Sequence, residues 1–261
     1  MKVCVLLARQ RSGTGALGSV LDQHPSFRYL GEVFHHDAID RSPNYFHFLK
    51  QQIELDPNFA LPGSGETRFT SYMERLDQLH PEKLKIVDIK YRSTHHFNGY
   101  WHGILEQPAL FRLITKFEIP VIHLTRSNYL KTYISGLLAD QNKIWHARAT
   151  DTIEHKYIKI DTRMAIGFIR QTAQEVDFMT TFLKKTPKVV TVDYDELFSA
   201  DGSLSDLVNH KLQHFLNVSP LQKTKPAFVK QTSDDLREVV ENYAELADAL
   251  RETPFGWMLR G

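Results

Sequence analysis

The 261-residue sequence has one cysteine, no Gly-Lys pair and no long uninterrupted hydrophobic run. Cys4 cannot form a disulfide within the chain, and its place in an apolar stretch favours a buried, inert thiol. We therefore expect a protein of a reducing, cytoplasmic compartment. The first apolar run is interrupted by Arg9 and Arg11, which makes it too short for a signal peptide or a membrane span.

The chain also lacks an excess of charge of either sign. Lys and Arg number 32 against 31 Asp and Glu, a formal net charge of +1. This balance predicts no global basic field for nucleic acid, so we expect a small-molecule partner. The sequence shows no internal repeat, low-complexity tract or linker, and 42% of its residues are hydrophobic. We expect one domain over residues 1–261.

The sequence does contain short β-branched runs that alternate with longer helical patterns. The predicted strands are Lys2–Ala8, Phe27–Leu30, Lys85–Tyr91, Pro120–Thr125 and Lys188–Asp193. The clearest predicted helices are Thr14–Gln23, Arg68–Leu79, Asn128–Asp140, Thr162–Lys184 and Asp234–Leu250. Asp56–Thr67 is rich in Pro and Gly and is predicted as a surface loop. The fold class that follows is α/β, with three layers (α/β/α) around a central, mainly parallel sheet.

The turn after the first predicted strand is suited to an anion, because backbone N–H groups and the positive end of the next helix converge there. The expected contacts are the charge of Arg11, two hydroxyls and the close approach of backbone at glycine, from Arg11, Ser12, Gly13, Thr14, Gly15 and Ala16. Without a Gly-Lys pair, a nucleoside-triphosphate loop is disfavoured. Gly13, Gly15 and Gly18 match a dinucleotide fingerprint, but that short pattern is weak by itself.

A longer series of residues is more specific. Arg11-Ser12-Gly13-Thr14 is followed by His24-Pro25 and then by Gly31-Glu32. This series resembles the 5′-phosphosulfate-binding loop, helix and strand of sulfotransferases that use 3′-phosphoadenosine 5′-phosphosulfate (PAPS). The resemblance implies a P-loop-like fold, PAPS as co-substrate, and a loop from Arg11 to Ala16 that binds its 5′-phosphosulfate.

Two further stretches carry the same resemblance. Val121–Ser135 resembles the family's 3′-phosphate-binding strand and helix, with Arg126 and Ser135 in the phosphate-gripping places. The nine-residue interval between them, together with Asn128 and Trp145-His146, resembles the bacterial carbohydrate branch of trehalose-sulfotransferase-like proteins. Residues 230–255 resemble that branch as well. They imply nucleotide contact by Lys230, or alternatively Lys223 or Lys225, and leave room for contact by Asn242, Tyr243 and Glu245.

Sulfuryl transfer asks the protein to align an acceptor hydroxyl with a leaving phosphate and to stabilise the charge that develops there, and it requires no metal. The resemblance assigns Arg11 to that charge and Glu32 to the role of general base. His35 and His36 are competing bases, because imidazole is matched to neutral pH. Lys90, at a strand end, is expected to point into the cleft and orient the acceptor or the sulfuryl group.

Two other groups of residues attract attention. His35-His36 and His95-His96 suggest a metal, but adjacent histidines are expected to point in different directions, and neither pair has an H-x-x-x-H or cysteine partner. We therefore predict no metal site. The aromatic residues Tyr91, Phe97, Tyr100 and Trp101 suggest a sugar-stacking platform, although such a density of aromatics is also typical of core.

Two further function classes stay open. A kinase-like phosphotransferase would need a Mg²⁺-binding carboxylate, for which Asp88 is the cleft candidate, and a non-catalytic nucleotide-binding module would keep the anion loop without turnover. For the sulfotransferase hypothesis, we expect a hydroxyl acceptor on a carbohydrate or glycoconjugate, with lipid and small-metabolite hydroxyls left open as well. Its contacts are expected from Asp37–Lys83 and Thr94–Trp101, where the sequence offers no recognised code. The oligomeric state stays open, a homodimer included.

Overall fold

A computed structural model of the chain describes residues 1–99, 102–103, 106–144, 157–221, 224–228 and 235–260. Its strands are β1 Val3–Ala8, β2 Phe27–Glu32, β3 Leu84–Lys90, β4 Val121–Thr125 and β5 Val189–Asp193. All neighbouring strands are parallel, in the order β2-β3-β1-β4-β5. The α-helices are α1 Thr14–Leu21, α2 Tyr45–Leu55, α3 Gly65–Gln78, α4 Ala109–Lys116, α5 Tyr129–Asn142, α6 Thr162–Leu183, α7 Asp206–Leu216 and α8 Tyr243–Arg251.

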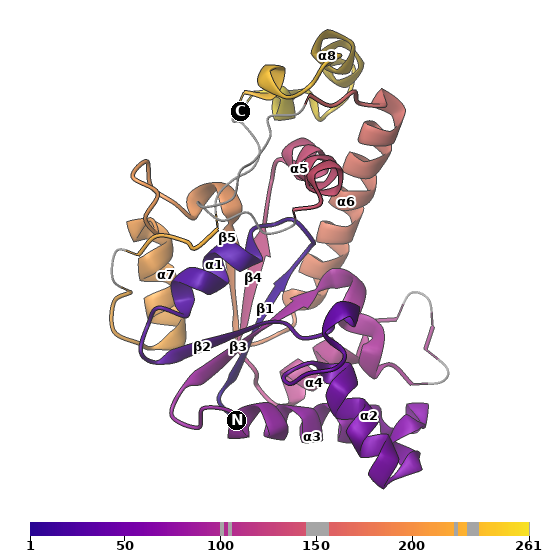
Figure 1. Cartoon of the computed structure of the whole chain (residues 1–261), viewed down its shortest axis with the longest axis vertical. Coiled ribbons are helices and arrows are strands. Elements are labelled where there is room, and N and C mark those ends of the chain that lie inside the picture. Colours follow the sequence, from indigo (N-terminus) through magenta and orange to yellow (C-terminus); the bar gives the residue numbers. More distant parts are fainter. Residues whose placement is uncertain (100–101, 104–105, 145–156, 222–223, 229–234, 261) are drawn as a thin grey trace.

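The sheet is covered on both faces, which confirms the expected three-layer α/β fold. Helices α1 and α7 pack on one face and α3, α4 and the second half of α6 on the other (Figure 1). The side chains of β1 alternate between these two cores, and all six of its residues are buried. A strand covered on both faces needs a continuous apolar run, as the sequence supplies here.

A third apolar cluster joins α5, the first half of α6 and α8 beyond the carboxyl ends of the strands (Figure 1). The strands themselves end at one common edge, because Ala8 pairs with both Lys90 and Leu124, and Glu32 pairs with Asp88. Open parallel sheets bind ligands outside this edge, close to where the connections turn to opposite sides of the first strand.

The predicted strands are all present, and β2 continues two residues beyond the predicted end. A register shift lies between Tyr29 and Gly31, and Gly31 has a φ of 74°. Glycine adopts this left-handed backbone without steric cost, so the strand passes through the irregularity to Glu32.

The single helix predicted for Asp234–Leu250 is confirmed from Tyr243, where α8 begins, but it is wrong over residues 235–242. Leu236–Glu238 forms a 3₁₀ turn, and the chain then hydrogen-bonds to the segment at Ile158 before α8 begins. The amide of Asn242 donates to the Ile160 carbonyl and accepts from the Ile160 N–H, both at 2.8 Å. The Val239 carbonyl and the Glu241 N–H pair with the backbone of Ile158, so these two groups find partners outside the helix that was predicted for them.

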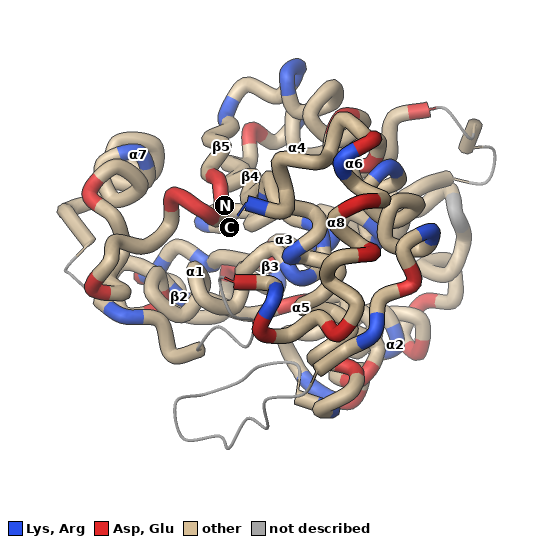
Figure 2. The backbone as a smooth tube through the Cα atoms, turned by 90° about the horizontal axis from the view of Figure 1, so that it is seen from above, with Lys and Arg blue, Asp and Glu red and all other residues tan. Residues whose placement is uncertain are grey.

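Asp56–Thr67 is not an open loop. It contains the 3₁₀ turns Pro57–Ala60 and Pro62–Ser64, and α3 already begins at Gly65. Helices α2, α4 and α7 have no counterpart among the predicted helices. No helix among the described residues combines the length and apolar character needed to cross a bilayer. Lys and Arg are interspersed with Asp and Glu along the chain (Figure 2), as the balanced composition predicts.

Candidate functional site

The turn between β1 and α1 is shaped by two left-handed residues. Arg11 has a φ of 64° and Gly13, the N-cap of α1, a φ of 88°. A Cβ on Gly13 would lie 2.3 Å from the ring carbons of Tyr194, so both the backbone angle and the close packing require glycine. The first helical N–H groups of α1 have no partner within the helix, and this turn therefore presents donors suited to an anion.

The structure brings the two predicted phosphate-binding stretches together. The guanidinium of Arg11 donates from Nη2 to the Ser135 hydroxyl at 2.9 Å and contacts the Ser135 carbonyl at 3.4 Å. Arg126 donates from Nη1 to the Arg11 carbonyl at 3.2 Å, and its guanidinium lies 4.6 Å from the centre of the Tyr194 ring. Residues from the turns that follow β1 and β4 thus meet a residue of α5 at one point, which sequence spacing alone could not establish.

This meeting point is electropositive and partly desolvated. Burial lowers the pKa of Arg11, and the positive charge of Arg126 lowers it further. Two like charges held this close repel each other, and a bound anion would relieve that repulsion. Asn128 fixes the turn that carries Arg126, because its side chain caps α5 and donates to the Met258 carbonyl at 2.9 Å.

Lys90 lies at the carboxyl edge as expected, but it is buried rather than pointing into open solvent. Its Nζ donates to Thr14 Oγ1 at 2.6 Å and to the two oxygens of Asp88 at 2.8 and 2.7 Å. Glu32 Oε2 is 3.9 Å from the same nitrogen. The lysine therefore links the anion loop to the proposed base.

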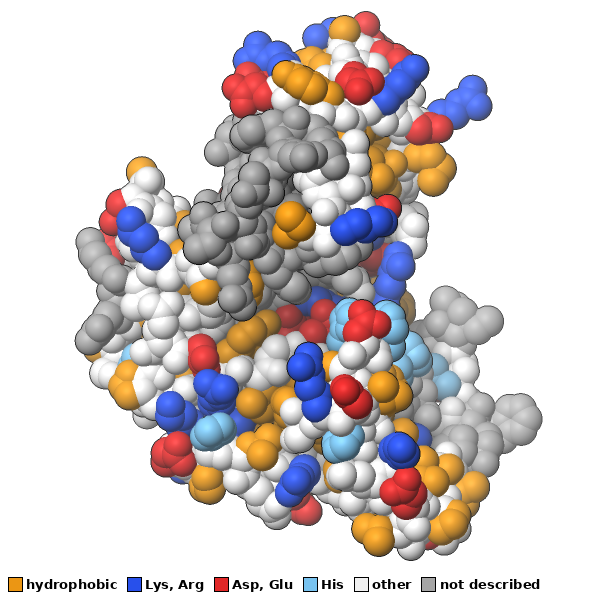
Figure 3. Space-filling view, in the orientation of Figure 1, with side chains coloured by type: hydrophobic (Ala, Val, Ile, Leu, Met, Phe, Trp, Pro, Cys, Tyr) orange, Lys and Arg blue, Asp and Glu red, His pale blue; other side chains and the backbone are white. Residues whose placement is uncertain are grey.

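Glu32 has the electrostatic environment of a general base. Burial raises its pKa and Asp88 raises it further, against the opposing charges of Lys90, His35 and His36. A carboxylate with a raised pKa accepts a proton more readily at neutral pH. Figure 3 shows a hollow in the middle of one face of the molecule, with acidic and histidine side chains at its rim.

Tyr29 joins the hydrogen-bond network of Lys90 and Asp88, although the sequence did not indicate it as a site residue. Its hydroxyl donates to Asp88 Oδ2 at 3.1 Å, and its ring packs so closely on α1 that a Cβ on Gly18 would lie 2.4 Å from it. Asp88, the candidate Mg²⁺ ligand of the kinase-like alternative, has both oxygens engaged by Lys90 and Tyr29. No sequence motif marks Tyr29, because its role depends on the register between β2 and β3.

The expectation that adjacent histidines point in different directions is wrong. The rings of His35 and His36 stack with centroids 4.9 Å apart, and the rings of His95 and His96 lie 4.3 Å apart. The ligand atoms of His35, His36 and Asp37 all lie within 4.8 Å of one another. His36 is exposed and contacts Asp37 at 3.0 Å, so it remains a geometrically accessible alternative base.

The aromatic platform is not supported by its described members. Tyr91 and Phe97 are 3% and 2% exposed and belong to the core, with the Tyr91 hydroxyl 2.6 Å from His123 Nε2. Several other residues lie outside the described part of the chain, namely Tyr100, Trp101, Trp145, His146, Lys223 and Lys230. Lys225 is exposed, and Asn242 donates to Glu245 at 2.9 Å at the start of α8.

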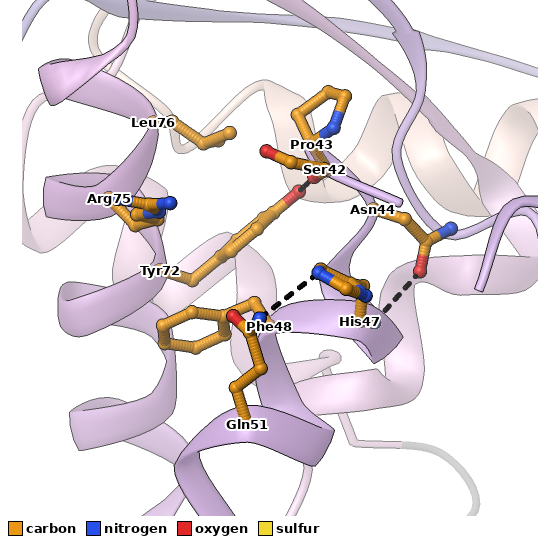
Figure 4. A pocket seen from close by; sticks show the side chains of 9 residues that line it. All are labelled: Ser42, Pro43, Asn44, His47, Phe48, Gln51, Tyr72, Arg75 and Leu76. Atoms are coloured by element: carbon orange, nitrogen blue, oxygen red, sulfur yellow. Dashed lines mark hydrogen bonds between the residues drawn. The ribbon is translucent and has the colours of Figure 1, made fainter. Parts of the chain in front are cut away.

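The segment that the sequence left unexplained forms a small hollow between α2 and α3 (Figure 4). It is lined by Ser42, Pro43, Asn44, His47, Phe48, Gln51, Tyr72, Arg75 and Leu76. The Tyr72 hydroxyl donates to the Pro43 carbonyl at 2.6 Å, and the Gln51 amide lies 3.1 Å from His47 Nε2 (Figure 4). The Tyr72 bond joins α3 to the segment before α2, whereas the Gln51–His47 contact lies within α2.

The fold is a three-layer α/β protein with an all-parallel sheet, and a glycine-containing turn joins its first strand to its first helix. No protein-family model matches the chain, and no curated protein does. Among solved structures, the crystal structure of a sulfotransferase from Alicyclobacillus acidocaldarius is similar, with a TM-score of 0.45 and 14% sequence identity. The match covers 100% of this chain and 96% of that one. Likeness at this level assigns no activity, so function has to be argued from the residues.

Proposed function

We propose that the protein is a PAPS-dependent sulfotransferase that transfers a sulfuryl group to a hydroxyl of a carbohydrate or glycoconjugate. The observation that carries the proposal is the junction of Arg11, Ser135 and Arg126 at the first turn, beside Glu32 and Lys90. A donor with phosphates at its 5′ and 3′ positions needs two groups of anion contacts, and a hydroxyl acceptor needs a base.

The nucleotide contacts divide between the two predicted stretches. The backbone N–H groups from Gly13 to Ala16, with the hydroxyls of Ser12 and Thr14, would hold the 5′-phosphosulfate. Arg126 and Ser135 would hold the 3′-phosphate. Arg11 lies between these groups, because it contacts Ser135 through its side chain and Arg126 through its carbonyl. The donor set consists of cations and neutral hydrogen-bond donors, which suits phosphates.

The transfer needs few protein groups. As the acceptor oxygen bonds to sulfur, the bond from sulfur to the bridging phosphate oxygen breaks, and Glu32 takes the hydroxyl proton. Arg11 and Lys90 stabilise the charge that develops on the leaving phosphate, since both lie at the loop that would hold it. The residues provide for this step without a metal ion. Asp88 and Tyr29 keep Lys90 in position.

The first test is calorimetric binding of 3′-phosphoadenosine 5′-phosphate (PAP), the desulfated donor, against ADP and against ATP with Mg²⁺. We expect PAP, in the absence of metal, to bind more tightly than ADP or than ATP with Mg²⁺. The Arg126→Ala variant should bind PAP about tenfold or more weakly, because a charged hydrogen-bond donor to phosphate is removed. Arg112→Ala is the matched control, since Arg112 is an exposed arginine on α4. A preference for ATP with Mg²⁺ would refute the proposal and favour a phosphotransferase.

A further inference from the structure

Arg68 on α3 is a buried arginine without a counterion. The residue is 8% exposed, and its Nε is fully enclosed with no hydrogen-bond partner. Over the described ranges of the chain, no hydrogen bond or ion pair joins its guanidinium to another residue. Only Nε is among the enclosed atoms, so the two terminal nitrogens keep some contact with solvent, and the charge of this arginine lies at the surface of the core without an acidic partner in the described ranges.

A second unsatisfied donor lies close to this charge. Tyr45, at the start of α2, is 1% exposed, and its buried hydroxyl has no hydrogen-bond partner. Burial raises the pKa of Tyr45 to about 12 although the charge of Arg68 acts to lower it, so the hydroxyl keeps its proton at neutral pH. Tyr72, one turn along α3 from Arg68, differs because its hydroxyl donates to the Pro43 carbonyl (Figure 4).

His96 is the third member of this group, together with Arg68 and Tyr45. Its ring stacks on Phe34 at 4.9 Å and lies 6.3 Å from the ring of Tyr45. Burial, then the neighbouring His95, then Arg68 lower the pKa of His96 to about 4, so the ring is neutral at pH 7. The charges that act on Tyr45 and His96 come from Arg68 and His95, and no carboxylate is among them.

This group contacts the segment that directly follows the proposed base. Phe34 follows Glu32 by two residues, and the backbone N–H of Tyr45 donates to the Val33 carbonyl at 2.8 Å. The residues of the group come from the two segments, 37–83 and 94–101, in which the sequence places the acceptor contacts. A ligand whose hydroxyl reaches Glu32 would extend toward this group.

We infer that Arg68 and Tyr45, with His96 beside them, bind an oxyanion carried by the acceptor, a carboxylate or a sulfate ester near the hydroxyl that is sulfated. The role as an acceptor subsite rests on the proposed function, whereas the binding of the anion itself does not. A planar guanidinium pairs with two oxygens of either group, and the tyrosine hydroxyl supplies a further donor. The acceptor class is thus an acidic sugar rather than a neutral one.

The direct test is calorimetry on the protein saturated with PAP, so that the loop between β1 and α1 is already filled. The probes are methyl glucuronide, glucose 6-sulfate and neutral methyl glucoside. We expect both acidic sugars to bind the wild type at least about tenfold more tightly than the neutral one, and Arg68→Met to remove this difference. Arg75→Met is the matched control, an exposed arginine two turns along the same helix.

Thermal unfolding separates a binding role from a structural one. Because only Nε of Arg68 is enclosed without a partner, we expect Arg68→Met to leave the Tm of the ligand-free protein unchanged or slightly higher, within about 2 °C. The acidic sugar that binds should raise the Tm of the wild type and not that of the variant. If Arg68→Met instead lowers the Tm and leaves sugar binding unchanged, Arg68 is a structural residue and the inference is wrong.

The experiments distinguish a failure of the oxyanion subsite from a failure of the proposed sulfotransferase function. If neither acidic sugar binds better than methyl glucoside to the PAP-bound wild type, the oxyanion subsite is refuted and the proposed function is untouched. If PAP does not bind, the titrations are run on the free protein with the same three sugars. Binding that depends on Arg68 would then support the anion site while the sulfotransferase proposal fails.

Discussion

Replacing Glu32 with glutamine tests the centre of the proposed mechanism. The change keeps the size of the side chain and removes its capacity to take a proton together with its negative charge. Glu32 Oε2 is 3.9 Å from Lys90 Nζ, but that lysine keeps its bonds of 2.8 and 2.7 Å to Asp88, so the network should survive. We expect kcat to fall by about 10²–10⁴-fold, the usual contribution of a general base. PAP affinity should stay within about twofold, because no contact joins Glu32 to Arg11 or Arg126 among the described residues.

The pH dependence sharpens this prediction. Burial raises the pKa of Glu32 in the folded protein, so kcat/KM of the wild type should decline on the acid side with an inflection above the ordinary value for glutamic acid. Glu32→Gln should lack this limb. A carboxyl with a raised folded-state pKa contributes stability that is complete below its unfolded pKa and lost as the pH rises through the folded pKa. The variant should therefore be at least as stable as the wild type at pH 7.

The assay follows PAP release from PAPS by chromatography in the presence of neutral and acidic sugar acceptors, together with urea unfolding at pH 5 and pH 7. Asp40→Asn is the control, because Asp40 is an exposed carboxylate on the same connection after β2. Full turnover in Glu32→Gln would refute the assignment of the base. Loss of PAP binding along with turnover would show that Glu32 maintains the loop instead of acting on the acceptor.

Three further results are expected. Ser135→Ala should weaken PAP binding by about tenfold, because it removes a hydroxyl at the arginine junction; unchanged affinity by calorimetry would contradict that role. Gly18→Ala should lower the free energy of unfolding in urea by about 1–3 kcal/mol, since its Cβ would lie 2.4 Å from the Tyr29 ring, whereas the uncrowded Gly167→Ala in α6 should raise it by about 0.5–1 kcal/mol; equal effects would refute the packing argument. Cys4, buried with its pKa raised to about 12, should resist thiol reagents until the protein unfolds, so rapid labelling of the folded protein would contradict this burial.

The local parts of the fold follow directly from the residues. Strand β1 is a continuous apolar run, so only a place inside a sheet covered on both faces buries it completely. Gly13 allows the left-handed cap from which α1 begins, and the turn at Arg11 to Ala16 is therefore recognisable as an anion loop from its own residues. The last helical region is harder to predict. There, Asn242 and Val239 hydrogen-bond to the segment at Ile158 and Ile160, and no pattern within the helix reveals such distant partners.

The sequence by itself therefore determined the α/β class and the strand positions, because each depends on residues that are neighbours along the chain. It also predicted an anion loop and, through short motifs and their resemblance to a known family, proposed Glu32, Lys90 and Arg126 as candidates. The tertiary structure decided which candidates meet. It joined Arg11 to Ser135 and placed Lys90 between Thr14 and Asp88. It also left Arg68 largely buried, with an enclosed Nε that has no hydrogen-bond partner in the described part of the chain. These outcomes depend on strand order, register and helix packing, which combine residues far apart in sequence, so no local pattern encodes them.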